Sequence, residues 1–149
     1  DITYIRLKND WLYLVAILDW FSRYILAWEL SDALGTEFCC QALKEALILA
    51  KPEIHNSDQG SQLTAKEYVE ILKSHPEIQI SMDAKGRAFD NIFNERLWRT
   101  IKYEEVYLKD YQSPKEARQS LASYIRFYNH ERLHQSLGYQ TPSEIYFKN

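Results

Sequence analysis

Hydrophobic and polar residues alternate from Ile2 to Lys8, in the sequence ITYIRLK, with the period of a half-buried β-strand. Asn9 and Asp10 follow as a turn signal, and the run WLYLVAIL that comes next is too apolar to have a solvent-facing side. The segment RYILAWEL, residues 23–30, supplies a further strand. The pattern therefore predicts three antiparallel strands at the start of the chain.

Helical and extended patterns follow one another in the middle of the chain. Apolar residues recur at helical spacing over residues 36–50, and a short strand is expected around Ile54. Thr64 and Glu67 have the spacing of a capping box, which predicts a second helix to about Ser74. The apolar run IQISM, residues 78–82, predicts a fifth strand.

Three helices are expected after this strand. Asp90 has the character of an N-cap for a long helix that ends near Glu105. The sequences Ser113-Pro-Lys-Glu and Thr141-Pro-Ser-Glu share a cap residue, a proline at the first helical position and a glutamate at the third. The order of elements predicts an α/β fold in which a five-stranded mixed sheet, three antiparallel then two parallel strands, is flanked by helices. We find no linker or internal repeat, so residues 1–149 are expected to form a single domain.

Composition narrows the class of protein. The longest apolar run is far shorter than the roughly 20 residues that span a bilayer, and no signal segment precedes it, so we expect a cytoplasmic protein without a membrane partner. Cys39 and Cys40 are adjacent and lack CxxC partners, which favours buried thiols over a disulfide framework or a zinc site. The four tryptophans are expected in the core or at interfaces.

The net charge of −3 hides a difference between two parts of the chain. Residues 1–82 carry 7 Lys and Arg against 12 Asp and Glu, whereas residues 83–132 carry 10 against 8. A local basic face is therefore compatible with an acidic chain.

Most of the 21 acidic residues have a local structural explanation. Helix caps, turns and solvated helix faces account for the following: Glu67, Glu116, Glu144 and Asp90 at caps; Asp10, Asp19 and Asp32 in turns; Glu37, Glu45, Glu70, Glu104 and Glu105 on exposed faces.

Three acids resist this sorting. Asp1 opens the first strand, which we expect to be central, where a buried charge is costly unless it is paired or coordinated. Asp58 follows a short strand, at the end of a sheet where α/β proteins place their sites, and Glu95 lies too far into its helix to be a cap. Carboxylates that converge need a hard cation such as Mg²⁺. Spacing alone does not show convergence, and a Glu95–Arg99 salt bridge worth about 0.3–0.5 kcal/mol is the competing interpretation.

Five ordered motifs carry a resemblance to a known family. The sequences DITYI, DWFSR, HNSDQGSQ, KGRAFDNIFNERLWRTIKYE and YNHERLHQSLGYQTPSE span nearly the whole chain. In this order they closely resemble the integrase core of bacterial insertion-sequence transposases of the insertion-sequence-three type, relatives of retroviral integrases. The resemblance implies a ribonuclease H-like fold and DNA strand cleavage and transfer without a covalent enzyme intermediate.

The resemblance also implies the site. Asp1, Asp58 and Glu95 take the positions of a D, D, E triad that binds two Mg²⁺ ions, which Mn²⁺ can replace. The chain begins on the first of these acids, so we expect the family's N-terminal DNA-binding helices to be absent and the α-ammonium of Asp1 to weaken metal binding. DNA, as transposon ends and target, is the expected partner, and the pairing of two ends implies a homo-oligomer.

Six further residues are expected to contact DNA. Asn91, Glu95, Arg99 and Lys102 fall on one helix face, which would place both bases beside the metals. Lys85 and Arg87 precede that helix as a DNA-facing loop, for which a plain surface turn is the alternative, and Arg132 belongs to the C-terminal motif, which we expect to be mostly structural. His130 and His134 have the spacing of a metal pair without a third ligand, and we expect them to pair or stack.

Two other functions compete with the transposase core. A catalytically silent DNA-binding or oligomerisation module would keep the same fold, and the start of the chain at Asp1 favours it. A nuclease of the ribonuclease H type would use the same metals, but the tail YNHERLHQSLGYQTPSE argues against it.

Overall fold

Three antiparallel strands open the chain, as predicted. In the computed structural model, which describes residues 1–82 and 92–148, β1 (Ile2–Arg6), β2 (Trp11–Leu18) and β3 (Ile25–Ser31) pair in the order β1-β2-β3. The register sets Ile2 opposite Val15, and it shifts at the end of β2 between Ile17 and Leu18. The central strand of this ladder is β2, so the prediction that the first strand is central is wrong for these hydrogen-bonded pairs.

The other two strands form a separate parallel pair. β4 (Ile54–Ser57) runs beside β5 (Gln79–Met82), with Ile54 opposite Gln79. The five strands and their directions are as predicted, but their ladders divide into three plus two within the described ranges rather than forming one sheet.

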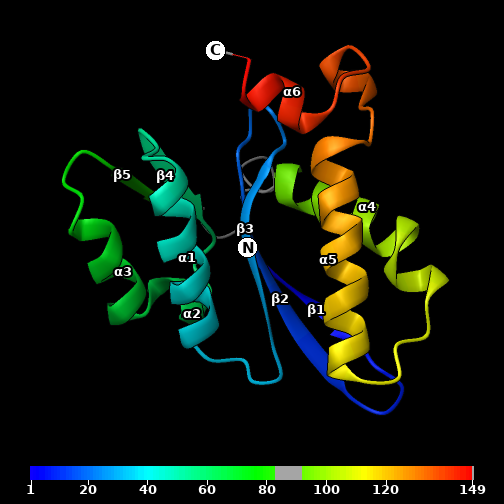
Figure 1. The fold of residues 1–149 in the computed structure, drawn as a ribbon. Helices are drawn as coiled ribbons and strands as arrows, with labels where there is room; N and C mark the ends of the chain where they lie inside the picture. Colours follow the sequence, from blue (N-terminus) through cyan, green and yellow to red (C-terminus); the bar gives the residue numbers. More distant parts are fainter. Residues whose placement is uncertain (83–91, 149) are drawn as a thin grey trace.

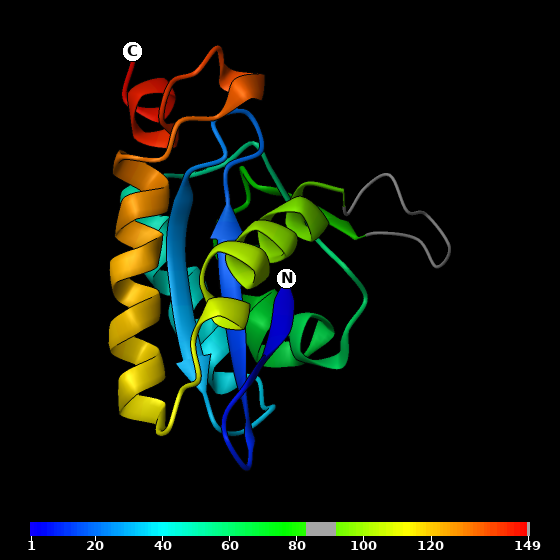
Figure 2. The same cartoon turned by 90° about the vertical axis from the view of Figure 1, so that its right-hand side faces the viewer.

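Helices cover both faces of the antiparallel sheet (Figures 1 and 2). On one face, α4 (Ile92–Glu104) and α5 (Pro114–His130) enclose a core with side chains such as Ile5 and Leu14. On the other face, α1 (Glu37–Leu49) and α3 (Lys66–Lys73) enclose a core around Val15 and Ala27. The continuously apolar sequence of β2 thus serves both cores, because successive side chains of a strand point to opposite faces.

The cysteines and the apolar helices were two further features of the sequence. Cys39 and Cys40 are free, buried thiols on α1, as predicted. Within the described ranges, none of the helices combines the length and hydropathy that a bilayer crossing requires.

The predicted capping box at Thr64 is wrong. The chain forms a separate short helix, α2 (Ser61–Thr64), and Thr64 ends it with a hydrogen bond from its hydroxyl to the carbonyl of Gly60 at 3.2 Å. α3 then starts after Ala65, which offers no side-chain cap. The short helix α2 precedes the predicted helix start, and Thr64 is the last residue of α2 instead of the cap of α3.

The predicted caps of the two C-terminal helices, Ser113 and Thr141, are confirmed. Ser113 accepts a hydrogen bond from the backbone of Glu116 at 3.1 Å at the start of α5, and Thr141 does the same for Glu144 at 3.1 Å at the start of α6 (Pro142–Tyr146). Two short 3₁₀ turns, η2 (Val106–Leu108) and η3 (Gln135–Leu137), link these helices. The predicted N-cap, Asp90, lies outside the described residues.

The end of α5 is bonded to the start of β3. Asn129 accepts a hydrogen bond from the backbone N–H of Ile25 at 2.9 Å and donates one to its carbonyl at 3.0 Å. His130 packs edge-on against Tyr24, and His134 packs edge-on against Tyr128. The C-terminal motif is therefore structural here, and its histidines stack as predicted.

Candidate active site

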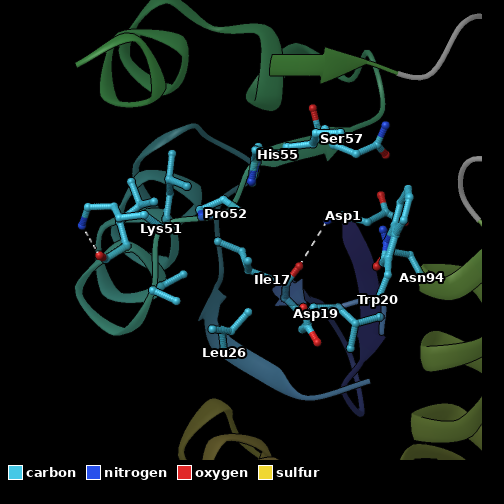
Figure 3. Close-up of a pocket in the computed structure, with 18 of the residues that line it drawn as sticks. Asp1, Ile17, Asp19, Trp20, Leu26, Lys51, Pro52, His55, Ser57 and Asn94 are labelled. Carbon is cyan, nitrogen blue, oxygen red and sulfur yellow. Dashed lines mark hydrogen bonds between the residues drawn. The ribbon is translucent and has the colours of Figure 1, made fainter. Parts of the chain in front are cut away.

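The carboxylate of Asp1 is bonded to helix α4. Its Oδ1 accepts a hydrogen bond from the backbone N–H of Ile2 at 2.8 Å, and its Oδ2 accepts one from the indole Nε1 of Trp98 at 2.9 Å. The amino group of Asp1 donates to the carbonyl of Ala16 on β2 at 3.2 Å (Figure 3). Trp98 is buried and lies one turn beyond Glu95 on the same helix. The first candidate acid is thereby fixed beside the helix that carries the third.

Asp58 follows the last residue of β4, where the chain turns into α2. Its Oδ1 accepts a hydrogen bond from the backbone N–H of Gly60 at 2.9 Å, a local turn that fixes the side chain. A Cβ atom on residue 60 would lie 3.0 Å from this oxygen, so glycine is the residue that permits the close approach. Asp58 is partly buried, with one carboxylate oxygen engaged in this turn.

Glu95 lies in the first turn of α4 and is exposed. The competing interpretation paired it with Arg99, but the ion pairs among residues 1–82 and 92–148 include neither residue. The Arg99 guanidinium lies instead 5.5 Å from the centre of the Tyr103 ring. The Glu95–Arg99 salt bridge of the competing interpretation is therefore absent from the described part of the chain.

One cavity brings together the elements that carry the three acids. It has a volume of about 410 Å³ and is lined by Asp1, by Ser57 at the end of β4 and by Asn94 on α4 (Figure 3). Ser57 directly precedes Asp58, and Asn94 directly precedes Glu95. The start of β1, the end of β4 and the start of α4 therefore meet at this cavity, whose lining within the described part of the chain includes Asp1 but neither Asp58 nor Glu95.

The wall of the cavity adds one titratable ring that the sequence did not single out. His55, on β4, lies within 2.9 Å of the Tyr68 hydroxyl, with Nε2 as the contacting atom. Burial, and to a smaller extent the α-ammonium of Asp1, lower the pKa of His55 to about 4. The ring is neutral at pH 7, so it places no additional positive charge beside the acids.

Asp19 also lines the cavity, and its role is structural, as predicted. Its Oδ2 accepts hydrogen bonds from the backbone N–H of Ser22 at 2.9 Å and from the Ser22 hydroxyl at 2.6 Å. These bonds hold the turn between β2 and β3 that carries the DWFSR sequence.

The donor atoms of the three acids suit a hard cation. Carboxylate oxygens are the ligands that Mg²⁺ takes in proteins, and each acid comes from a different element. Among the described residues, however, no group of three His, Cys, Asp or Glu side chains is close enough to hold a metal ion. The structure therefore brings the three elements together, and convergence of the three carboxylates on a metal stays a prediction.

The predicted DNA contacts divide into three groups. Arg99 and Lys102 follow Glu95 at helical spacing on α4, where burial lowers the pKa of the Lys102 ammonium. Lys85, Arg87 and Asn91 lie outside the described residues.

Arg132 makes a close ion pair instead of standing alone. Its guanidinium donates to both carboxylate oxygens of Glu104, from Nε at 2.8 Å and from Nη2 at 2.6 Å. This hydrogen bond is the main reason why the pKa of Glu104 is lowered. Its role as a DNA contact stays a prediction.

Two acids at the end of α4 correct the sequence interpretation. Glu104, predicted to be a solvated face, binds Arg132 and also accepts a hydrogen bond from the Tyr124 hydroxyl at 2.6 Å. Glu105 is buried and accepts hydrogen bonds from Tyr111 and Ser120. Their partners lie on α5 and its flanking loops, contacts that helix periodicity does not reveal.

Sequence reasoning missed Trp98 as the partner of Asp1. Its indole N–H is a donor that needs an acceptor when the ring is buried, and it lies one turn from Glu95. A tryptophan one turn from a candidate acid on an apolar helix face was the signal in the sequence that could have indicated this partner.

Comparisons with known proteins agree with this arrangement. An integrase core domain model matches residues 1–88, and a second integrase core domain model matches residues 76–142. The chain belongs to the integrase core family.

The integrase core is similar to curated transposases of bacteria. It is 33% identical to the transposase for insertion sequence element IS904 of Lactococcus lactis, with 97% of this chain and 58% of that protein covered. It is also 33% identical to the transposase InsF for insertion sequence IS3A of Escherichia coli, with 100% of this chain and 53% of that protein covered. The chain spans about half the length of these relatives.

The fold of this integrase core is that of retroviral integrase catalytic cores. The HTLV-2 integrase catalytic core domain in complex with magnesium, in its trimeric form, superposes with a TM-score of 0.77 at 20% identity, over 97% of this chain and 91% of that one. The predicted ribonuclease H-like α/β fold is thereby confirmed.

Proposed function

We propose that this integrase core is the catalytic domain of a DNA transposase that cleaves phosphodiester bonds and joins DNA strands. Asp1, Asp58 and Glu95 are its reactive-site acids. The observation that carries the proposal is the meeting of the start of β1, the end of β4 and the start of α4 at one cavity, with Asp1 bonded to Trp98. Membership of the integrase core family supports it.

The surrounding residues perform the positioning in this proposal. Trp98 orients the Asp1 carboxylate, and the Gly60 N–H orients that of Asp58. Arg99 and Lys102 lie along α4 beyond Glu95, where a phosphodiester can accept their hydrogen bonds. A water molecule, and then a DNA 3′-hydroxyl, attacks phosphorus in line as the bridging oxygen leaves.

Magnesium is the cofactor that these acids suit. Asp1, Asp58 and Glu95 would hold two Mg²⁺ ions, or Mn²⁺ in their place, which supply stabilisation of charge on the attacking and leaving oxygens. A solved relative of this fold is a magnesium complex.

DNA and a second copy of the chain are the proposed partners. Strand joining between two element ends requires more than one active site in one assembly, and the HTLV-2 core was solved in a trimeric form. We propose a cytoplasmic homo-oligomer that acts on element ends and target DNA.

Metal-dependent nicking of supercoiled plasmid DNA tests the proposal without knowledge of the element ends. We expect Asp58→Asn and Glu95→Gln each to lower the nicking rate by at least 100-fold in Mg²⁺ or Mn²⁺, because each removes a carboxylate charge from the site. Gel separation of supercoiled and relaxed DNA over time measures the rate.

Two substitutions provide matched controls. Asp32→Asn changes an exposed turn acid, and Glu37→Gln changes an exposed acid in the first turn of α1, as Glu95 lies in the first turn of α4. Both should keep the wild-type rate. Equal rates for all four variants would refute the acid triad, and a folded wild-type chain that binds DNA without nicking it would favour the catalytically silent module.

A further inference from the structure

A basic surface lies around the end of β1 opposite to Asp1. It is formed by the β1–β2 turn, the last turns of α4 and the segment after η2, which together line a groove of about 760 Å³. We call it the hairpin surface and define it by its basic and aromatic side chains: Arg6, Lys8, Lys102, Lys109, Tyr4, Trp11 and Tyr107. Of these, only Lys102 belongs to the face of α4 that also carries Glu95.

Positive charge dominates the hairpin surface although the chain as a whole is acidic. Four bases line the groove, and Asp110 is the acid among its lining residues. Nearby Asp10 uses its carboxylate to accept a hydrogen bond from the backbone of Trp11 at 2.8 Å. The ion pairs of the described residues include none of the four bases, so their charges are available to an external anion.

Exposed aromatic rings lie among these bases. Tyr4 is 51% exposed, Trp11 47% and Tyr107 64%, so the core is wrong as a location for Trp11 and an interface remains of the two predicted alternatives. The Trp11 ring packs edge-on against Tyr4, and the Arg6 guanidinium lies 5.8 Å from its centre. Surfaces that bind nucleic acids combine basic side chains, which contact the backbone, with exposed aromatic rings, on which nucleobases stack.

Hydrogen bonds hold the segments of this surface together. The backbone N–H of Lys8 donates to the carbonyl of Tyr111 at 3.2 Å, which ties the β1–β2 turn to the segment that carries Lys109. Tyr111 is itself buried and donates a hydrogen bond to Glu105 at the end of α4. The charges are therefore presented in a fixed arrangement, which reduces the ordering cost of binding.

We propose that the hairpin surface binds the phosphodiester backbone of DNA as a contact separate from the candidate acids. The proposal rests on the proposed function for its choice of DNA as the partner. Lys102 is shared by the α4 face and the groove, so a strand that meets α4 beyond Glu95 continues towards Lys8 and Lys109. An acidic protein surface also carries negative charge, but it lacks the regular spacing of DNA phosphates and nucleobases.

The test is the salt dependence of DNA binding, measured by fluorescence anisotropy in EDTA. The wild-type chain is compared with the triple variant Arg6→Gln, Lys8→Gln, Lys109→Gln, using a labelled duplex and a single strand of equal length. We expect at least a tenfold loss of affinity at low salt. For the duplex, we also expect the slope of log K against log salt to become shallower by about 2 to 3, from about 0.9 per phosphate contact.

A matched triple variant controls for net charge. Lys66→Gln, Lys73→Gln, Lys148→Gln removes three exposed lysines from outside the groove and should bind DNA like the wild type apart from a small general weakening. The single substitution Trp11→Leu should weaken the single strand more than the duplex, because unpaired bases can stack on the ring.

The outcomes separate this proposal from the catalytic one. Equal affinity and slope for the two triple variants overturn the hairpin surface, even where Asp58→Asn abolishes nicking. Loss of DNA affinity only in the first variant supports it, even where the acid substitutions have no effect. A change of oligomeric state in sedimentation with unchanged DNA affinity would assign the surface to a protein contact and overturn the proposal.

Discussion

The hydrogen bond from Trp98 to Asp1 is the most informative single contact at the residue scale. It joins side chains 97 positions apart and leaves the Asp1 carboxylate between a backbone N–H and an indole N–H. Hydrogen bonds to charged groups contribute about 1.5–3 kcal/mol, more than neutral ones. Trp98 is a positioning residue in this description, because it acts through Asp1.

Replacement of this donor tests that role. Trp98→Phe keeps an aromatic ring and removes the N–H, so we expect the free energy of unfolding to fall by about 1–3 kcal/mol. Urea denaturation followed by circular dichroism measures the change. Trp11→Phe is the matched control, since the Trp11 ring is half exposed, and it should stay within about 0.5 kcal/mol of the wild type. Equal effects of the two substitutions would contradict the assignment.

Sequence reasoning at this scale identified acids but not their partners. Asp1, Asp58 and Glu95 stood out because the sequence indicated no cap or turn for them, although Asp58 does bond the N–H of Gly60 in a local turn. The structure brings the elements of the three acids to one cavity. Arg132 and Glu104 lie 28 positions apart, so the ion pair between them leaves no periodic signal. Contacts of this kind depend on how helices pack, which a single sequence does not specify.

At the scale of elements, local hydrogen-bonding rules predicted the starts of α5 and α6. Ser113 and Thr141 cap α5 and α6 as expected, because cap, proline and glutamate agree at both places. Thr64 has part of the same pattern without the proline, and it ends α2 instead of capping α3. The local signal was therefore correct where several features coincided and wrong where one stood alone.

Alanine substitutions at the three positions test this distinction. Ser113→Ala and Thr141→Ala each remove a cap acceptor, and we expect each to lower the free energy of unfolding by about 1 kcal/mol. Thr64→Ala removes a hydroxyl that caps nothing in α3, so its effect should be less than about 0.5 kcal/mol. Thermal unfolding of the three variants under one buffer condition gives the comparison. A loss of unfolding free energy for Thr64→Ala equal to that of the other two variants would show that Thr64 caps α3 after all.

At the scale of the whole molecule, the fold class could be predicted and the strand pairing between its halves could not. Apolar and alternating runs, together with the turn signals between them, gave the number and direction of strands, because these patterns are local. The separation of β1–β3 from β4–β5 depends on the space beside Asp1 and on how α1 packs across both parts. Neither is encoded in a short stretch of sequence.

One pair of acids links the stability of the molecule to pH. Glu29 on β3 shares a hydrogen bond with Glu45 on α1, and burial first, then this bond and the Glu45 charge, raises the pKa of Glu29 to about 7. The protonated form therefore stabilises the fold fully below about 4.5, the ordinary pKa, and this contribution is lost as pH rises through about 7.

Glu29→Gln should remove part of that pH dependence. The amide cannot ionise, so we expect the variant to be more stable than the wild type at pH 8 by less than about 1 kcal/mol, since Glu29 is only partly buried. At pH 4 the difference should vanish. Urea midpoints between pH 4 and pH 8 measure it, with Glu53→Gln in an exposed loop as the control. A constant difference across this range would show that Glu29 does not titrate as described.

The pairing of Asn129 with Ile25 has a consequence for the behaviour of the protein in concentrated solution. β3 is an outer strand of its ladder, and free backbone groups on outer strands recruit strands from other molecules into aggregates. The Asn129 amide occupies both the N–H and the carbonyl of Ile25, as a neighbouring strand would. A helix side chain thus closes one rung of that edge and protects the chain against edge-to-edge association.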